Sequence, residues 1–130
     1  MGYRSEVSSL IYGPEDKIKA FITEQKLLSN GLSFDYLNEY IKLFLGKEEG
    51  ENILFIHLYV DDIKWYKGYE DIDKWEQLLE SAKEFGLHTE FARVGEEPTD
   101  LEYKGENYRI NFGRPQIYTD IDTTNELKLF

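Results

Sequence analysis

A histidine and two neighbouring aspartates are the residues of this 130-residue sequence whose types best suit acid–base or metal chemistry. His57 is followed by Asp61 and Asp62, and an imidazole near carboxylates can bind a divalent cation or transfer protons. A paired aspartate at the end of a strand is, however, more often part of a turn. A metal-dependent hydrolase built on these three residues is therefore the weakest of three functional hypotheses.

Most other catalytic chemistry is missing from the sequence. Cysteine is absent, which excludes disulfides, thiol nucleophiles and thiolate zinc sites, and His88 is the only other histidine. The sequence also lacks the GxSxG, HExxH, CxxC, EF-hand, Walker and GxGxxG motifs. We therefore predict a binding protein that is not an enzyme and that uses neither a metal nor a cofactor.

A group of cationic and aromatic side chains has the types that recognise phosphates and bases. Arginine forks bind phosphate oxygens in pairs, and tryptophan or tyrosine rings stack on bases. The group therefore predicts a site for a small nucleotide-like ligand. Alternatively, the aromatic rings fill the edge of the core and the arginines pair with the abundant carboxylates. The residues are Arg4, Lys64, Trp65, Tyr66, Arg93 and Arg109.

Carboxylates form a stripe on the outward face of a predicted helix over residues 70–85. Neighbouring members lie about 6 Å apart by helix geometry, which resembles the spacing of DNA phosphates. The stripe therefore predicts a surface that docks on a basic nucleic-acid-binding protein. The alternative is a solvated helix face, because Lys74 and Lys83 interrupt the negative field. The stripe consists of Asp73, Glu76, Glu80 and Glu84.

The composition limits the partners of the chain. With 26 acidic and 15 basic residues the formal charge is -11, which disfavours direct binding of nucleic acid. The longest apolar stretch, residues 53–60, is too short to cross a membrane. A chain without cysteine fits a reducing compartment, so we expect the cytoplasm, that of the host cell if the protein is viral.

The hydrophobic pattern predicts one α+β domain over residues 1–130. Pro14 suits the first turn of a helix that ends near residues 29–31, Ser33 suits the N-cap of a second helix closed by Gly46, and Gly86 suits the C-cap of the third. We expect an exposed polar loop at 47–52, a hairpin with its turn at 104–107 and a further strand at 117–121. The tail at 126–130 is apolar, so we expect it to pack against the rest of the domain. Strands are expected over residues 3–12, 53–60 and 87–94, and helices over 14–28, 33–46 and 70–85.

The strand at 53–60 has two unlike faces. Its even positions are aliphatic, whereas its odd positions include Phe55, His57 and Tyr59. The element order predicts helices on one side of a mainly antiparallel sheet in a ferredoxin-like arrangement. The odd positions would then lie on an open second face, suited to a dimer interface or a ligand floor.

Three stretches of the chain carry distinctive motifs, namely MGYRSEV, IKWYKGYEDIDKWEQLL and FARVGEEPTDLE. Their centres are residues 1–5, 64–66 and 93–96. In this order they resemble a widespread set of small tailed-phage proteins, over most of the chain except residues 27–52. The resemblance implies a viral origin and names no activity. Small accessory phage proteins are often directed against host restriction, CRISPR or nucleotide-signalling defences, so counter-defence is what it implies here.

These observations rank the hypotheses. The first is a phage-type, non-enzymatic counter-defence protein that sequesters a small nucleotide-like immune signal as a homo-oligomer. The second is an acidic inhibitor or DNA mimic that binds a host defence protein such as a CRISPR or restriction component. Ionic strength separates the two, because docking through a carboxylate stripe weakens steeply with salt.

Overall fold

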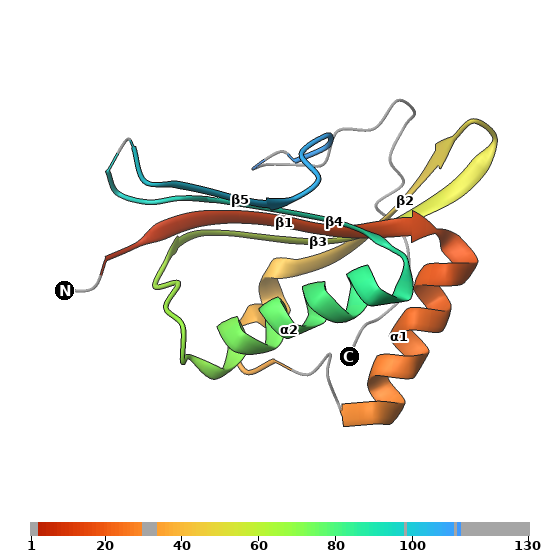
Figure 1. Cartoon of the computed structure of the whole chain (residues 1–130), viewed down its shortest axis with the longest axis horizontal. Coiled ribbons are helices and arrows are strands. Elements are labelled where there is room, and N and C mark those ends of the chain that lie inside the picture. The colour runs from red at the N-terminus through yellow and green to blue at the C-terminus, as the bar shows by residue number, and fades with distance from the viewer. Residues whose placement is uncertain (1–2, 30–33, 98, 111, 113–130) are drawn as a thin grey trace.

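The computed structural model describes residues 3–29, 34–97, 99–110 and 112, with the side chains of 26–29 excepted (Figure 1). Five strands and two α-helices account for most of this part of the chain. The elements are β1 (Ser5–Pro14), α1 (Glu15–Ser29), the 3-10 helix η1 (Leu37–Tyr40), β2 (Ile41–Glu48), β3 (Glu51–Ile63), α2 (Glu70–Phe85), β4 (His88–Val94) and β5 (Leu101–Gly105).

The strands form one antiparallel sheet in the order β2-β3-β1-β4-β5, and both α-helices lie on the same side of it (Figure 1). The first four strands and two helices follow the β-α-β-β-α-β order, with β5 added beside β4. The predicted α+β fold with a ferredoxin-like arrangement is therefore confirmed. β1 is the central strand and bonds to both β3 and β4.

The main core lies between the sheet and the helices. The even positions of β3 at Leu54, Ile56 and Leu58 are fully buried in this cluster, as the alternation predicted. Trp75 of α2 is also fully buried, and its indole N–H donates to Ser9 Oγ over 3.0 Å. α2 ends where predicted, at Gly86, whose φ of 93° is the left-handed C-cap conformation that favours glycine.

The helix predicted over residues 33–46 is wrong. Among its described residues, 34–46, only a short 3-10 turn at Leu37–Tyr40 is helical, and β2 follows as an edge strand paired with β3. Ile41 and Leu43 point into the core by strand alternation, whereas Phe44 packs on the other face. The same residues also recur at helical spacing, and pairing with β3 decides between the two patterns. The polar loop shortens to a turn at Glu49 and Gly50, which both have positive φ.

The hairpin predicted around residues 104–107 is wrong as well. β5 pairs with β4 through the 95–100 loop, and residues 107–110 do not pair with β5. Arg109 instead packs its guanidinium over Tyr12 and Phe55 on the second face of the sheet, at 5.1 and 5.6 Å from the ring centroids. The predicted Ser33 cap, the strand at 117–121 and the tail at 126–130 lie outside the described residues.

The second face of the sheet is covered at its centre rather than open as predicted. A small cluster of Leu10, Tyr12, Phe44 and Phe55 is buried there, with Ile110 packed against it. His57 and Phe55 are also buried, whereas Tyr59 is half-buried. Within the described residues, no helix is both long enough and apolar enough to cross a membrane.

Candidate functional site

The three motif-bearing stretches meet at one end of the sheet, where β1 begins and β3 and β4 end. The backbone N–H of Tyr3 donates to the hydroxyl of Tyr66, and the Tyr3 hydroxyl donates to Asp100 over 2.6 Å. The N–H of Arg4 donates to the Glu96 carboxylate. Residues that are 63 to 97 positions apart in sequence are therefore joined in one network.

Gly95 is required by the close packing of this network. A Cβ placed at Gly95 would overlap the Tyr3 hydroxyl and the Asp100 carboxylate. A side chain at this position of the 93–96 motif is therefore excluded by steric overlap, and this argument does not depend on a positive φ. The N–H of Gly95 also donates to the carbonyl of Asp100 over 2.8 Å, which closes the loop between β4 and β5.

Arg93 is saturated by carboxylates at the centre of the network. Its Nη2 and Nε atoms each lie 2.9 Å from a carboxylate oxygen, of Asp100 and Glu102 respectively, and Nη1 donates to Ser5 Oγ over 3.0 Å. Its side chain is only 16% exposed. The hydrogen bond with Asp100 raises the pKa of Arg93, and the same contact holds the pKa of the Asp100 carboxyl below its usual range. Arg93 thus orders the loop and presents little of its fork to a ligand.

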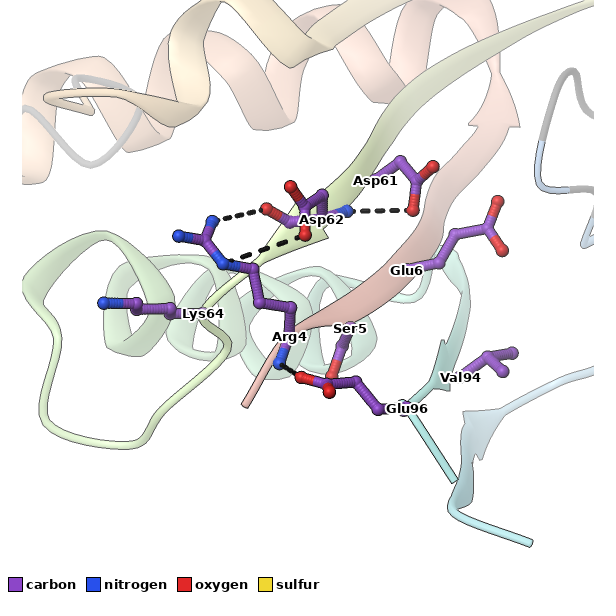
Figure 2. A pocket seen from close by; sticks show the side chains of 9 residues that line it. Arg4, Ser5, Glu6, Asp61, Asp62, Lys64, Val94 and Glu96 are labelled. Atoms are coloured by element: carbon purple, nitrogen blue, oxygen red, sulfur yellow. Dashed lines mark hydrogen bonds and ion pairs between the residues drawn. The ribbon is translucent and has the colours of Figure 1, made fainter. Parts of the chain in front are cut away.

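A cleft of about 600 Å³ lies beside this network (Figure 2). Arg4 crosses it, and its Nη1 donates to the backbone carbonyl of Asp62 over 2.9 Å while Nε lies 3.7 Å from the Asp62 carboxylate. Both side chains are exposed, by 45% and 78%. The cleft is lined by Arg4, Ser5, Glu6, Asp61, Asp62, Lys64, Val94, Gly95 and Glu96.

A β-bulge shapes the floor of the cleft. The register shifts between Ser5 and Val7 of β1, so β3 carries one extra residue at this point. Asp62 has a φ of 58°, in the left-handed region that aspartate tolerates better than most residues. Bulges redirect side chains at the ends of strands, and here Asp61 and Asp62 are both exposed at the cleft.

A second hollow of about 400 Å³ adjoins the cleft and shares Arg4, Asp61, Asp62 and Lys64 with it. Three tyrosines that are each more than one third exposed form its wall, namely Tyr36, Tyr40 and Tyr69. Val60, Ile63 and Glu39 complete the lining. The sequence pattern pointed to none of these tyrosines. Tyr36 and Tyr40 lie in the segment that it predicted as a helix, and Tyr69 lies just beyond the 64–66 motif.

The tyrosine wall is held in place by a buried carboxylate. Asp71, in the first turn of α2, is 1% exposed and accepts three backbone N–H bonds. They come from Asp35, Tyr36 and Leu37, at 2.9, 2.7 and 3.0 Å. A buried carboxylate needs such partners, and Asp71 thereby attaches α2 to the turn before β2. The feature of the sequence that could have indicated this role of Asp71 is its place in the first turn of the predicted helix, next to the apolar Ile72.

The predicted cationic and aromatic group is divided among four places. Arg4 and Lys64 line both hollows, whereas Arg93 is bound as described above. Trp65 packs on Phe91 at 5.7 Å, against the core.

The other members of that group have structural contacts. The Tyr66 hydroxyl accepts the Tyr3 N–H, and its ring meets Tyr69 edge-on at 5.5 Å. Arg109 pairs with Glu48 on the second face, outside both hollows.

The predicted carboxylate stripe on α2 is interrupted. Glu76 pairs with Lys104 of β5 at 3.2 Å, and Asp73 accepts the N–H of Gly68 over 3.1 Å. Glu80 and Glu84 are exposed. Two of the four predicted carboxylates, Asp73 and Glu76, are therefore engaged in contacts among the described residues.

His57 does not join the aspartates at the end of its strand. It is buried on the second face, and its Nε2 lies 3.0 Å from Ser8 Oγ. Over the described ranges, no three histidine or carboxylate side chains gather closely enough to hold a metal ion. The catalytic cluster of the third hypothesis is therefore not assembled in the structure.

Carboxylates outnumber cations around the two hollows. Among the described residues that line them, five acidic side chains face two basic ones, and the balance of these residues is therefore negative. The acidic residues are Glu6, Glu39, Asp61, Asp62 and Glu96, and the basic ones are Arg4 and Lys64. No protein-family model, curated protein or solved structure matches this chain.

Proposed function

We propose that this protein is a non-enzymatic binding protein that holds a basic segment of another protein against the acidic cleft around Arg4. One observation carries the proposal: Arg4, Arg93 and Arg109 are each paired with a carboxylate of the chain itself, while the cleft keeps an excess of negative charge. A surface of this kind attracts cations and repels phosphates.

The resemblance to tailed-phage proteins supplies the setting for this proposal. A phage protein that acts against host defences meets restriction and CRISPR proteins, whose nucleic-acid-binding surfaces are rich in lysine and arginine. An acidic protein with a net charge of -11 can occupy such a surface and exclude nucleic acid from it. We therefore propose a host nucleic-acid-binding defence protein as the partner.

The test compares two charge reversals of equal size. The cleft variant carries Asp61→Lys, at the cleft and the adjoining hollow, and Glu39→Lys, at the adjoining hollow alone. Its matched control carries Glu80→Lys and Glu84→Lys on α2. Binding of a fluorescent arginine-rich peptide is measured by anisotropy at several salt concentrations. We expect the cleft variant to lose about 10-fold or more in affinity and the control less than about 3-fold, with steep weakening by salt in the parent protein.

Two results would contradict the proposal. Equal loss in both variants would mean that the peptide senses net charge alone. A loss confined to the α2 variant would place the docking surface on Glu80 and Glu84 instead. Circular dichroism of each variant verifies that the fold is kept.

A second candidate function is the capture of a small nucleotide-like immune signal. It is favoured by the convergence of Arg4 and Lys64 beside exposed tyrosine rings, which can bind a phosphate and stack on a base. Calorimetry with cyclic and linear signalling nucleotides tests it, and Arg4→Ala should then abolish the heat of binding. Sedimentation with and without nucleotide tests the homo-oligomer that we proposed with this function.

A further inference from the structure

The hollow beside the cleft has a composition that suits one long cationic side chain. Its wall is three exposed tyrosine rings, and its floor includes the buried side chains of Val60 and Ile63. Its rim carries Glu39 and Asp61. An apolar floor accommodates the methylene stem of an arginine or lysine, and the rings and carboxylates bind the charged end.

Arginine fits this wall better than lysine does. A guanidinium is planar, stacks on aromatic rings and is weakly hydrated, whereas an ammonium keeps its water. Burial, followed by the nearby Asp71 charge, raises the pKa of Tyr36, so its phenol ionises even less readily than that of a free tyrosine.

The chain already places a guanidinium of its own at this site. Arg4 lies between the two hollows and contacts the Asp62 backbone carbonyl and carboxylate. The distance of 3.7 Å to the carboxylate and the exposure of both side chains make this a weak pair. A second guanidinium can therefore replace Arg4 at Asp62 with little loss of intramolecular stabilisation.

The wall is ordered before any partner arrives. Asp71 fixes the backbone of residues 35–37 through its three hydrogen bonds, and Tyr69 lies edge-on against Tyr66. A preformed wall reduces the entropy lost on binding, which is how a small pocket provides a strong anchor. Tyrosine and arginine are also the residue types most often found at the energetic centre of protein interfaces.

We infer that the hollow walled by Tyr36, Tyr40 and Tyr69 is the anchor site for a single arginine of the basic partner, and that Arg4 is an internal occupant which this arginine displaces from Asp62. The inference rests on the proposed binding of a basic protein segment and names its central contact. It also gives Arg4 a role opposite to that in the nucleotide hypothesis. There Arg4 binds the ligand, whereas here it competes with it.

The experiment uses the same arginine-rich peptide and follows the side-chain Nε–Hε signal of Arg4 by NMR, assigned with Arg4→Lys. Adding peptide should shift the Arg4 signal and leave that of Arg93 in place. Tyr40→Ala and Tyr69→Ala should each weaken binding by about 2- to 5-fold, the range for a cation over an aromatic ring. Tyr103→Ala, which removes an exposed tyrosine from β5, is the matched control and should change nothing.

The sign of the Arg4 effect decides between the hypotheses. Arg4→Gln should bind the peptide more tightly, by about 2-fold or more, because a weak exposed ion pair no longer competes. Weaker peptide binding in Arg4→Gln would overturn the inference. So would an unmoved Arg4 signal in the parent protein, a measurement that does not depend on any variant remaining folded.

The two proposals fail in distinguishable ways. If the peptide binds and responds to salt and to the cleft charge reversal, but neither the tyrosine variants nor the Arg4 signal respond, the anchor site is refuted and the proposed function stands. If the peptide does not bind the parent protein at all, both are refuted.

Discussion

Arg4 and Arg93 lie at the same end of the sheet but in very different surroundings. Arg93 is 16% exposed and has carboxylate oxygens at 2.9 Å from two of its nitrogens. Arg4 is 45% exposed, and its guanidinium Nε lies 3.7 Å from the Asp62 carboxylate. Residue type alone would make both of them ligand-binding candidates. The comparison shows that saturation by neighbouring carboxylates separates an arginine that orders a loop from one that remains available at a cleft.

The largest expected effect is on stability, and it comes from Arg93. Arg93→Ala leaves Asp100 and Glu102 without their partner in a half-buried site, so we expect a loss of about 2–3 kcal/mol in the free energy of unfolding. Arg4→Ala should cost less than about 1 kcal/mol, as is usual for an exposed pair. Urea denaturation of the two variants measures both values. Equal costs would show that the two arginines do not differ as the distances indicate.

Gly95 gives the next largest effect, because it supports the Arg93 side of the comparison. Gly95→Ala should destabilise the fold by about 1–2 kcal/mol, since the added methyl overlaps Tyr3 and Asp100. Tyr3→Phe removes one of the two overlapping groups. The alanine substitution should therefore cost less in a Tyr3→Phe background, which a double-mutant cycle by urea denaturation can measure. Additive costs would exclude this steric explanation.

Acid should weaken the Arg93 region through the Asp100 carboxyl. The pKa of the Asp100 carboxyl is lowered in the folded protein, chiefly by Arg93 and then by Tyr3. A lowered carboxyl pKa contributes stability above its unfolded value of about 3.9, and this stability is lost as the pH falls through the folded value. The midpoint of thermal unfolding of the parent protein should thus fall below about pH 4 more steeply than that of Asp100→Asn. Parallel curves would contradict this assignment.

The last expected effect concerns titration rather than stability, at the edge of the cleft. Glu6 lines the cleft, and its carboxylate accepts the Tyr59 hydroxyl over 2.7 Å, which raises the pKa of Tyr59 to about 12. Glu6→Gln should return the pKa of Tyr59 toward about 10. The ultraviolet absorbance of tyrosinate, with Tyr59→Phe as the assignment control, measures the change. An unchanged pKa of Tyr59 in Glu6→Gln would contradict the hydrogen bond between Glu6 and Tyr59.

The sequence predicted those parts of the fold whose local pattern has a single solution. The alternation at 53–60 and the apolar stripe at 70–85 fit only a strand and a helix respectively, and both are confirmed. Ile41 and Phe44 lie three positions apart, which is helical spacing, whereas in β2 they face opposite sides of the sheet. Their conformation depends on pairing with β3, which is a long-range contact that a local pattern does not contain.

The candidate site was predicted only in part, because it too depends on contacts between residues far apart in sequence. Arg4 and Lys64 were identified from residue type, and both line the cleft. The saturation of Arg93 depends on Asp100 and Glu102, and nothing in the spacing of these residues distinguishes them from other carboxylates. Tyr36 reaches the hollow because its backbone bonds to Asp71, which lies 35 positions away in sequence.

The central position of β1 has a consequence for how quickly a partner can arrive. The cleft has one wall at the end of β3 and another at the end of β4, and β1 is hydrogen-bonded along its length to both. Widening the cleft would require several of these interstrand hydrogen bonds to break together. Association should therefore follow a single kinetic phase whose rate increases linearly with partner concentration, without the plateau that a slow opening step would impose.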